Sequence, residues 1–339
     1  MDFRRLGNGI LKVSELSFGA WETIGRVSYD TAKDLMLTAY DAGINHFDNA
    51  DEYSGLGNAE QAMGKIIKDM KRSDIILSSK AFWDVGPGPN DRGLSRKHLV
   101  ETVNSTLKNM GIEYLDFFYC HRYEAKVIGQ TDPNLEEVLR AMDDLIHQGK
   151  VLYWGTSCWT AFQLSQAYGM AERFNSYKPS VEQPQYNMFV REAVEKDLLE
   201  ASRKLGFGII TWSPLYNGIL TGKYNKGIPA DSRLANSNFT WLGFDKEITP
   251  ERVDKVKQLT ALAQDLGGSM PQLAIAWLLR LPEVTSVILG ASKVNQLLEN
   301  VKALELKKKL SPDVLTRIEE ILGNDPNPAP YEPEKPSFE

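Results

Sequence analysis

The sequence predicts an α/β fold of the (β/α)8 TIM-barrel class, in which eight parallel strands alternate with helices. Short apolar runs alternate along the chain with amphipathic helical stretches, a pattern typical of parallel βα units. Polar residues stand at or just after the ends of several runs, where such a barrel carries its active site. The 339 residues accommodate a barrel of about 250 residues with extended loops and insertions.

The elements follow one another in the order that this fold requires. A hairpin is predicted over residues 3–13, with its turn at residues 7–9, and it precedes the first barrel strand. The eight strands are predicted at residues 15–20, 44–49, 75–80, 115–121, 151–157, 180–185, 208–212 and 284–289. Helices are predicted at residues 28–42, 96–110, 135–148 and 193–205, each followed by a glycine that suits the position after a helix: Gly43, Gly111, Gly149 and Gly206.

Composition limits the domain organisation and the class of protein. Residues 1–323 are predicted to form one barrel domain, and residues 324–339 a proline-rich, acidic tail that is a loop or disordered. A hydrophobic content of 42% and a charged content of 25% are those of an ordinary globular protein. The net charge of −6 and the lack of a basic stripe indicate no nucleic-acid partner.

Other sequence signals exclude several kinds of protein. The N-terminal residues lack a signal-peptide core and no long apolar run occurs, so we expect a cytoplasmic protein without membrane insertion. The two cysteines have neither disulfide-framework nor zinc-site spacing, and we expect no metal. Residues 86–91 only begin to resemble the Gly-x-Gly-x-x-Gly pattern, so a Rossmann domain is not predicted.

Four polar side chains at strand ends suit the reduction of a carbonyl group. Hydride addition creates an alkoxide that needs a proton donor within hydrogen-bond reach, and Tyr53 can donate. A free phenol has a pKa of about 10, and we expect the Lys80 ammonium to lower the pKa of Tyr53. Asp48 would pair with Lys80, and His121 would direct a ring N–H at the carbonyl oxygen. Taken singly, Asp48 could be a helix cap, Lys80 a solvated strand end and His121 a rim histidine; together they favour catalysis.

A phosphate site is predicted in the last third of the chain. Residues 289–296 cross from a strand into a helix, and a helix N-terminus at the top of a barrel favours a phosphate group. Ser292 and Gln296 are four residues apart and share one face of that helix. Lys223 and Arg233 supply cations from the long loop between residues 214 and 249.

The motifs together resemble those of the aldo-keto reductases. Residues 47–53 read Phe-Asp-Asn-Ala-Asp-Glu-Tyr and are followed by Gly-Asn-Ala-Glu at residues 57–60. Within that superfamily the chain looks most like the branch of the voltage-gated potassium-channel β-subunits and their microbial relatives, through residues 92–98, 153–157, 211–215 and 271–277. The resemblance covers roughly residues 3–325 and implies that the hairpin closes the bottom of the barrel.

The resemblance implies NADPH/NADP⁺ as cofactor and assigns the residues that bind it. Tyr53 matches the acid, Lys80 and Asp48 the residues that tune it, and His121 the residue that orients the substrate. The positions that match cofactor contacts are Trp21, Ser157, Gln183, Trp212, Ser213, Pro214, Leu215, Gly218, Lys223, Arg233, Gly290, Ser292, Gln296, Glu299 and Asn300. Among them, Trp212 matches the aromatic on the nicotinamide, Ser157 and Gln183 the carboxamide partners, and Glu299 and Asn300 the adenine contacts, whereas Ser292, Gln296, Lys223 and Arg233 match the 2′-phosphate contacts.

Aromatic residues in predicted loops are candidates for the wall of a substrate pocket. They are Trp21, Phe82, Trp83, Tyr123, Tyr186 and Trp241. Such a pocket would suit aromatic or otherwise apolar aldehydes. Animal channel β-subunits carry asparagine where this chain has His121, so the match here is to the enzymatic pattern of the wider superfamily.

The sequence therefore predicts an NADPH-dependent reductase of aldehydes and some ketones, and two alternatives stay open. One is a regulatory subunit that binds NADP(H) with weak or no turnover; we expect no N-terminal extension able to reach a channel pore, because the chain begins almost at the hairpin. The other is a barrel isomerase or lyase that acts on phosphorylated sugars. Channel β-subunits form four-fold rings and other members of the superfamily are monomers, so the resemblance allows a homotetramer or a monomer.

Overall fold

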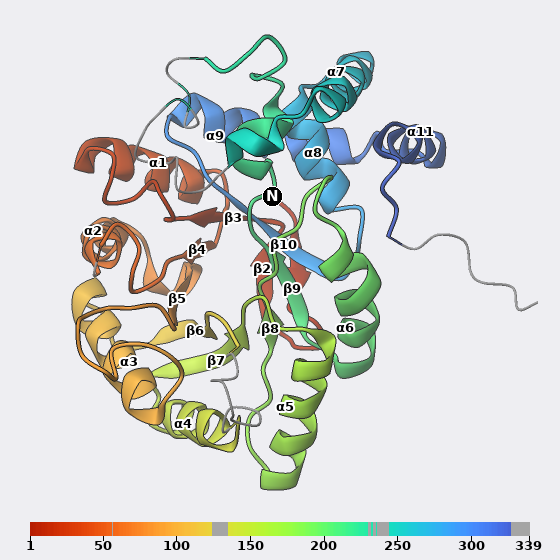
Figure 1. The fold of residues 1–339 in the computed structure, drawn as a ribbon. Helices are drawn as coiled ribbons and strands as arrows, with labels where there is room; N and C mark the ends of the chain where they lie inside the picture. Colours follow the sequence, from red (N-terminus) through yellow and green to blue (C-terminus); the bar gives the residue numbers. More distant parts are fainter. Residues whose placement is uncertain (56, 124–134, 230–231, 233–234, 236–243, 327–339) are drawn as a thin grey trace, which may run out of the picture.

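The computed structural model describes residues 1–55, 57–123, 135–229, 232, 235 and 244–326. Eight parallel strands close into a barrel in the order β10-β3-β4-β5-β6-β7-β8-β9, and helices surround the strands (Figure 1). The barrel strands are β3 (Leu16–Gly19), β4 (His46–Asp48), β5 (Ile76–Ala81), β6 (Leu115–Cys120), β7 (Val151–Thr156), β8 (Val181–Glu182), β9 (Gly208–Thr211) and β10 (Val284–Leu289). The predicted (β/α)8 fold is confirmed.

The helices occupy the predicted positions between strands and add several elements near the C-terminus. They are α1 (Tyr29–Asp41), α2 (Asn58–Ile66), α3 (Arg96–Met110), α4 (Leu135–His147), α5 (Ala161–Phe174), α6 (Leu199–Leu205), α7 (Pro250–Asp265), α8 (Met270–Leu278), α9 (Val294–Val301), α10 (Ala303–Lys307) and α11 (Pro312–Leu322). Short helical turns are η1 (Ile67–Asp69), η2 (Arg72–Asp74), η4 (Tyr216–Thr221) and η7 (Phe244–Glu247). Helices α7 and α11 lie side by side at one edge of the barrel (Figure 1).

The N-terminal hairpin closes the end of the barrel opposite the strand C-termini. Strands β1 (Phe3–Arg5) and β2 (Lys12–Ser14) pair antiparallel, as predicted. Leu6 and Val13 are buried in one cluster with Phe117, Ile210 and others inside the barrel. A Cβ at Gly7 would lie 2.1 Å from the Gly206 carbonyl oxygen, so this close approach of the hairpin requires glycine. Access to the interior is left to the rim at the strand C-termini.

Two elements differ most from their predictions. The predicted strand at residues 180–185 is only Val181–Glu182, because Pro184 has no N–H with which to continue the ladder. The predicted helix at residues 193–205 begins as a π-helix, Ala193–Leu198, before α6. The π-helix carries Glu195, whose carboxylate pairs with the buried Arg191; hydrophobic periodicity does not distinguish this wider turn from an α-helix.

The first residues after α11 are anchored to the barrel. Asn324 donates from its amide to the Met188 carbonyl oxygen at 2.9 Å and accepts from Arg191 at 3.1 Å. The tail predicted over residues 324–339 therefore starts with a fixed residue, and residues 327–339 lie outside the described part of the chain.

Candidate active site

The four predicted catalytic residues meet at the C-terminal rim of the barrel. Asp48 is the last residue of β4, Lys80 is next to the last residue of β5, and His121 directly follows β6. Tyr53 lies in the turn after β4 and faces both Lys80 and His121. Parallel strands in register bring their ends to one edge, so residues far apart in sequence form one cluster.

Lys80 lies at the centre of this cluster and is fully buried. Its Nζ donates to Asp48 Oδ2 at 2.6 Å, to the Asn49 carbonyl oxygen at 2.7 Å and to the Tyr53 hydroxyl at 3.3 Å. An ammonium group has three donors, and all three are used. Because Asp48 is only 3% exposed, the pair forms a buried salt bridge whose charges depend on one another.

A further set of hydrogen bonds fixes the Asp48 carboxylate. Its Oδ1 accepts from Ser78 Oγ at 2.7 Å and from Gln183 Nε2 at 3.0 Å. The hydroxyl of Ser78 also contacts His46 Nε2 at 3.1 Å, and His46 Nδ1 lies 2.9 Å from Ser17 Oγ. Asp48 therefore accepts from two side chains of β5, Ser78 and Lys80, and from Gln183 after β8, and these bonds hold its carboxylate toward Lys80.

Tyr53 retains its proton strongly in this arrangement, contrary to our expectation of a lowered pKa. Burial, the largest cause, raises the pKa of Tyr53 well above its usual value, and the carboxylates of Asp48 and Glu52 raise it further while Arg122 opposes them. The Lys80 charge is neutralised by Asp48 at 2.6 Å, which limits its effect on the phenol. Tyr53 is consequently a protonated phenol rather than a phenolate.

His121 contacts both Tyr53 and Trp83. Its ring lies edge-on to Tyr53, with centroids 6.1 Å apart, and edge-on to Trp83 at 6.3 Å. Burial, together with the charges of Lys80 and Arg122, holds the pKa of His121 well below its usual value. The imidazole is therefore neutral and carries one N–H.

The residues predicted at the nicotinamide end lie next to the catalytic cluster. Ser157, Gln183 and Trp212 each follow a barrel strand, namely β7, β8 and β9. Ser157 Oγ donates to the Gln183 carbonyl oxygen at 2.8 Å and accepts from Arg122 at 3.2 Å. Since the Gln183 side chain donates to Asp48, a chain of hydrogen bonds links these residues to the predicted catalytic residues.

The loop after β9 has an irregular backbone. The predicted cofactor residues in it are Ser213, Pro214, Leu215, Gly218 and Lys223, which are described, and Arg233, which lies outside the described residues. Ser213 and Gly218 have φ values of 58° and 92°, in the left-handed region. A Cβ at Gly218 would lie 2.7 Å from Lys223 Nζ, so the two predicted residues are adjacent and the glycine makes room for the ammonium.

The predicted phosphate site is a helix start at the end of β10. Gly290 follows the strand and is exposed, and the N-cap residue of α9, Lys293, makes no side-chain capping bond. Gln296 Oε1 accepts from the backbone N–H of Ser292 at 3.1 Å and from its hydroxyl at 3.3 Å, so the two side chains do share one face. Backbone N–H groups at such a start suit an anion.

The two residues predicted to contact adenine lie further along α9. Glu299 accepts from Gln272 Nε2 at 2.8 Å and pairs with Lys302 at 3.3 Å. Asn300 is 5% exposed. Gln272 and Lys302 thus hold the Glu299 side chain in place without a ligand.

The predicted pocket aromatics divide into residues near the site and residues in the core. Trp83 contacts His121 and lies edge-on to Phe82 at 5.1 Å, whereas Phe82 itself is 6% exposed. Trp21 is half-buried after β3, and Tyr123 lies edge-on to a buried tryptophan at 4.7 Å. Trp241 lies outside the described residues.

Tyr186 was wrongly predicted as a pocket residue. It is fully buried, its hydroxyl donates to Glu195 and accepts from Arg280 at 2.9 Å, and its ring lies 5.5 Å from that of Trp277. An aromatic after a strand end packs outward as readily as inward, and no local sequence pattern indicates the ion pairs around Tyr186.

Two charged residues of the site were not predicted. Glu52 precedes Tyr53 and brings Oε1 to 3.4 Å from His121 Nδ1. Arg122 follows His121, and its charge acts on the titration of both Tyr53 and His121. Their positions directly beside predicted catalytic residues were the only signal for them in the sequence.

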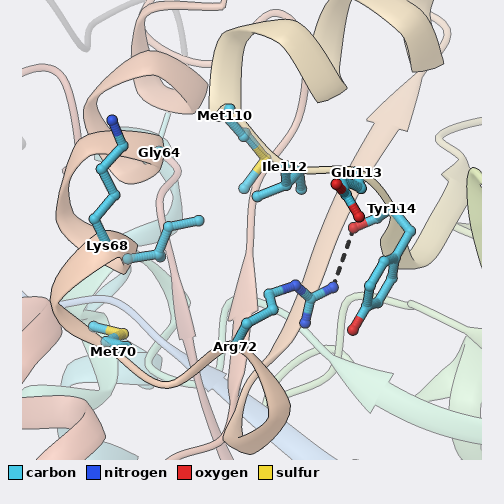
Figure 2. A pocket seen from close by; sticks show the side chains of 10 residues that line it. Gly64, Lys68, Met70, Arg72, Met110, Ile112, Glu113 and Tyr114 are labelled. Atoms are coloured by element: carbon cyan, nitrogen blue, oxygen red, sulfur yellow. Dashed lines mark hydrogen bonds between the residues drawn. The ribbon is translucent and has the colours of Figure 1, made fainter.

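A separate cavity of about 300 Å³ lies away from this rim, between α2 and the turn after α3 (Figure 2). Arg72 in its wall donates to the Tyr114 carbonyl oxygen at 3.1 Å and to Asp116 at 2.7 Å.

In the described part of the chain, no group of three or more histidine, cysteine or acidic residues could hold a metal ion. No helix there combines the length and apolarity needed to cross a bilayer.

Comparison with known proteins agrees with this geometry. The aldo/keto reductase family model matches residues 15–323. A probable voltage-gated potassium channel subunit beta of Arabidopsis thaliana is 45% identical over 330 residues, which cover 96% of this chain and 98% of that protein. A protein of the same description from Oryza sativa subsp. japonica is 46% identical with the same coverage, and a putative one from Schizosaccharomyces pombe is 45% identical over 96% of this chain and 94% of its own length. The chain therefore belongs to the aldo/keto reductase family.

Proposed function

We propose that the protein reduces aldehydes, and some ketones, to alcohols by NADPH-dependent hydride transfer, with Tyr53 as general acid. The observation that carries the proposal is the buried contact of Lys80 Nζ with both Asp48 Oδ2, at 2.6 Å, and the Tyr53 hydroxyl, at 3.3 Å. A donor tied to a salt bridge at the C-terminal rim of a barrel is the arrangement that carbonyl reduction needs.

The roles of the chain's own residues follow from these contacts. The raised pKa of Tyr53 keeps its proton in place until the carbonyl oxygen becomes an alkoxide and accepts it. Lys80 then stabilises the phenolate through the hydrogen bond it already donates to that oxygen, and Asp48 keeps the ammonium in position. The N–H of His121 orients the substrate oxygen and polarises the carbonyl.

The donor set along the rim fits NADPH, whose nicotinamide supplies the hydride when bound. The α9 start near Ser292 offers backbone N–H groups, and Lys223 offers a cation, for the phosphates. Trp212 would stack on the nicotinamide, and Ser157 and Gln183 would bond its carboxamide. Lys223 with Arg233 would favour NADPH over NADH through the 2′-phosphate.

The test is turnover with a panel of aldehydes and ketones, with NADPH and NADH measured side by side. We expect aldehyde-dependent NADPH oxidation, and a loss of kcat by orders of magnitude in Tyr53→Phe at nearly unchanged NADPH affinity, because the hydroxyl serves only proton transfer. Tyr40→Phe is the matched control, since within the described residues that hydroxyl makes an exposed 3.4 Å contact with Asp74, away from the site. Turnover by Tyr53→Phe at the wild-type rate would refute the assignment.

A second function is favoured by the names of the relatives, which describe channel β-subunits. In that reading the protein binds NADP(H) and regulates a membrane partner with little turnover. Tight NADPH binding without reduction of any aldehyde would support it. NADPH titration followed by tryptophan fluorescence also tests the sugar-phosphate isomerase alternative, which requires no nicotinamide.

We further propose a cytoplasmic homotetramer as the working assembly, because the sequence resembles the channel β-subunits, which form four-fold rings. Light scattering coupled to size-exclusion chromatography measures the mass directly. A mass of one chain would remove the tetramer without affecting the proposed chemistry.

A further inference from the structure

The proposed mechanism leaves one part of the site unused, a pair of acidic residues beside His121. Asp51 is 7% exposed and the side chain of Glu52 is 23% exposed, and both stand in the turn that carries Tyr53. Glu52 Oε1 lies 3.4 Å from His121 Nδ1. The Glu52 carboxyl group therefore faces the buried nitrogen Nδ1 of the His121 ring.

The polar atoms in this corner are unsatisfied as long as they carry no protons. Within the described residues, His121 Nδ1, both carboxyl oxygens of Asp51 and Glu52 Oε2 are buried and have no hydrogen-bond partner as long as both carboxyl groups are ionised, and a proton between Asp51 and Glu52 would join their side chains. Carboxylate oxygens only accept, and so does an imidazole nitrogen without a proton. Buried polar atoms are nearly always paired, and protons shared between these groups would pair them.

The surrounding charges support this conclusion. Burial, followed by the neighbouring Glu52, raises the pKa of Asp51 well above its usual value, and burial also raises the pKa of Glu52. The charged and titratable groups that face the corner are Asp48, Asp51 and Tyr53 of the β4 segment, Glu60 of α2, Lys80 of β5 and Arg122 after β6. With His121 held neutral, the proton available to bridge Nδ1 and Oε1 sits either on the ring or on the carboxyl group.

We propose that the protonation state of Glu52 sets the tautomer of His121. As a carboxylic acid, Glu52 donates to Nδ1, which leaves the ring proton on Nε2, from where it donates to the carbonyl oxygen of the substrate. As a carboxylate, Glu52 accepts from Nδ1–H, and Nε2 then presents a lone pair that repels that oxygen. Glu52 is thus a positioning residue that acts through His121.

This inference rests on the proposed carbonyl reduction for its kinetic consequence, but not for the tautomer itself. The active form has Glu52 protonated, so kcat/KM should fall as pH rises through its ionisation, approaching tenfold per pH unit. Tyr53, with its raised pKa, ionises only at higher pH. The NADPH dissociation constant should not follow this profile, because Glu52 acts through the substrate-orienting ring.

Two variants separate the titrating carboxyl group from the space that it fills. Glu52→Gln keeps the shape and a hydrogen-bond donor but cannot ionise, and Glu52→Met keeps the length without a donor. Both should remove the alkaline fall of kcat/KM. The exposed Glu305→Gln, on α10, is the matched control and should retain the wild-type profile. A fall of equal steepness in Glu52→Gln and wild type would overturn the proposal.

Nitrogen-15 NMR of ring-labelled protein reads the tautomer without any turnover. The chain has four histidines, and the resonances missing from His121→Asn assign those of His121. We expect wild type to shift from the Nε2–H to the Nδ1–H tautomer as pH rises, and Glu52→Gln to show no such shift. If the tautomer of His121 in the wild-type protein does not change with pH, the inference is wrong. If no aldehyde is reduced, the proposed function fails, whereas this measurement still decides the tautomer.

Discussion

Acidification should destabilise the wild-type protein more than a His46→Gln variant. His46 is fully buried inside the barrel and holds two hydroxyl groups, those of Ser17 and Ser78, with its two ring nitrogens. Burial lowers the pKa of His46 from 6.5 to about 4, the charge of Asp48 opposes this shift, and that of Lys80 adds to it. The ring therefore remains neutral in the folded protein under conditions in which the unfolded chain binds a proton.

The sign and size of the effect follow from linkage. The folded pKa of His46 is depressed, so its contribution to stability is complete above the unfolded value of 6.5 and is lost as pH falls toward about 4. Between about pH 7.5 and about pH 5 the free energy of unfolding should decrease by roughly 2 kcal/mol through this residue alone. The loss should level off below the folded pKa.

The assay is guanidinium unfolding of wild type and His46→Gln at both pH values. The glutamine amide can bond both hydroxyls but does not titrate, so the difference in pH dependence isolates His46. Glu182 acts in the opposite direction, because burial raises its pKa to about 8 and acid favours its folded form, but both proteins share it. Equal losses of stability in the two proteins would refute the reasoning.

Four substitutions test the candidate site directly. Lys80→Met leaves Asp48 buried without its counter-ion, so it should cost about 3–5 kcal/mol in chemical unfolding and lower kcat strongly; an unchanged unfolding midpoint would contradict the buried pair. Lys223→Ala or Arg233→Ala should weaken NADPH about ten- to a hundredfold in fluorescence titrations and NADH much less, and equal weakening would show that the clamp is misplaced. His121→Asn should lower kcat/KM for aldehydes less than Tyr53→Phe does, with the NADPH dissociation constant unchanged, because asparagine keeps a donor on a shorter side chain; unaltered kinetics would leave His121 without a catalytic part.

The cluster of Asp48, Lys80 and His121 was predictable because it depends only on strand ends. In a parallel barrel every strand delivers its C-terminal residue to the same rim, so the position of a polar residue at the end of an apolar run is enough to locate it in space. The same rule explains why residues 115–121 and 284–289 were bounded almost as observed. The pattern of apolar residues therefore predicts where a strand ends, and with it the place of a polar residue at the rim, from a few neighbouring residues of sequence.

Long-range contacts and electrostatics were not predictable in this way. Gln183 bonds Asp48 although 135 residues separate them, and the bond depends on where β8 ends at a proline. The pKa of Tyr53 was predicted in the wrong direction, because the sequence shows the nearby ammonium but neither the burial of the phenol nor the pairing of that ammonium with Asp48. Such balances are set by three-dimensional distances that no local pattern records.

The raised pKa of Tyr53 has a consequence for the direction of the proposed reaction. Reduction requires a protonated phenol at the start, and burial together with the Asp48 carboxylate holds the pKa of Tyr53 well above its usual value, which keeps Tyr53 protonated. Oxidation of an alcohol requires the phenolate as base, which the same groups disfavour. The alkoxide formed by hydride addition is the stronger base, so proton transfer to it from Tyr53 is favourable while Lys80 stabilises the phenolate left behind. Because these groups keep Tyr53 protonated, we expect the site to favour carbonyl reduction over alcohol oxidation.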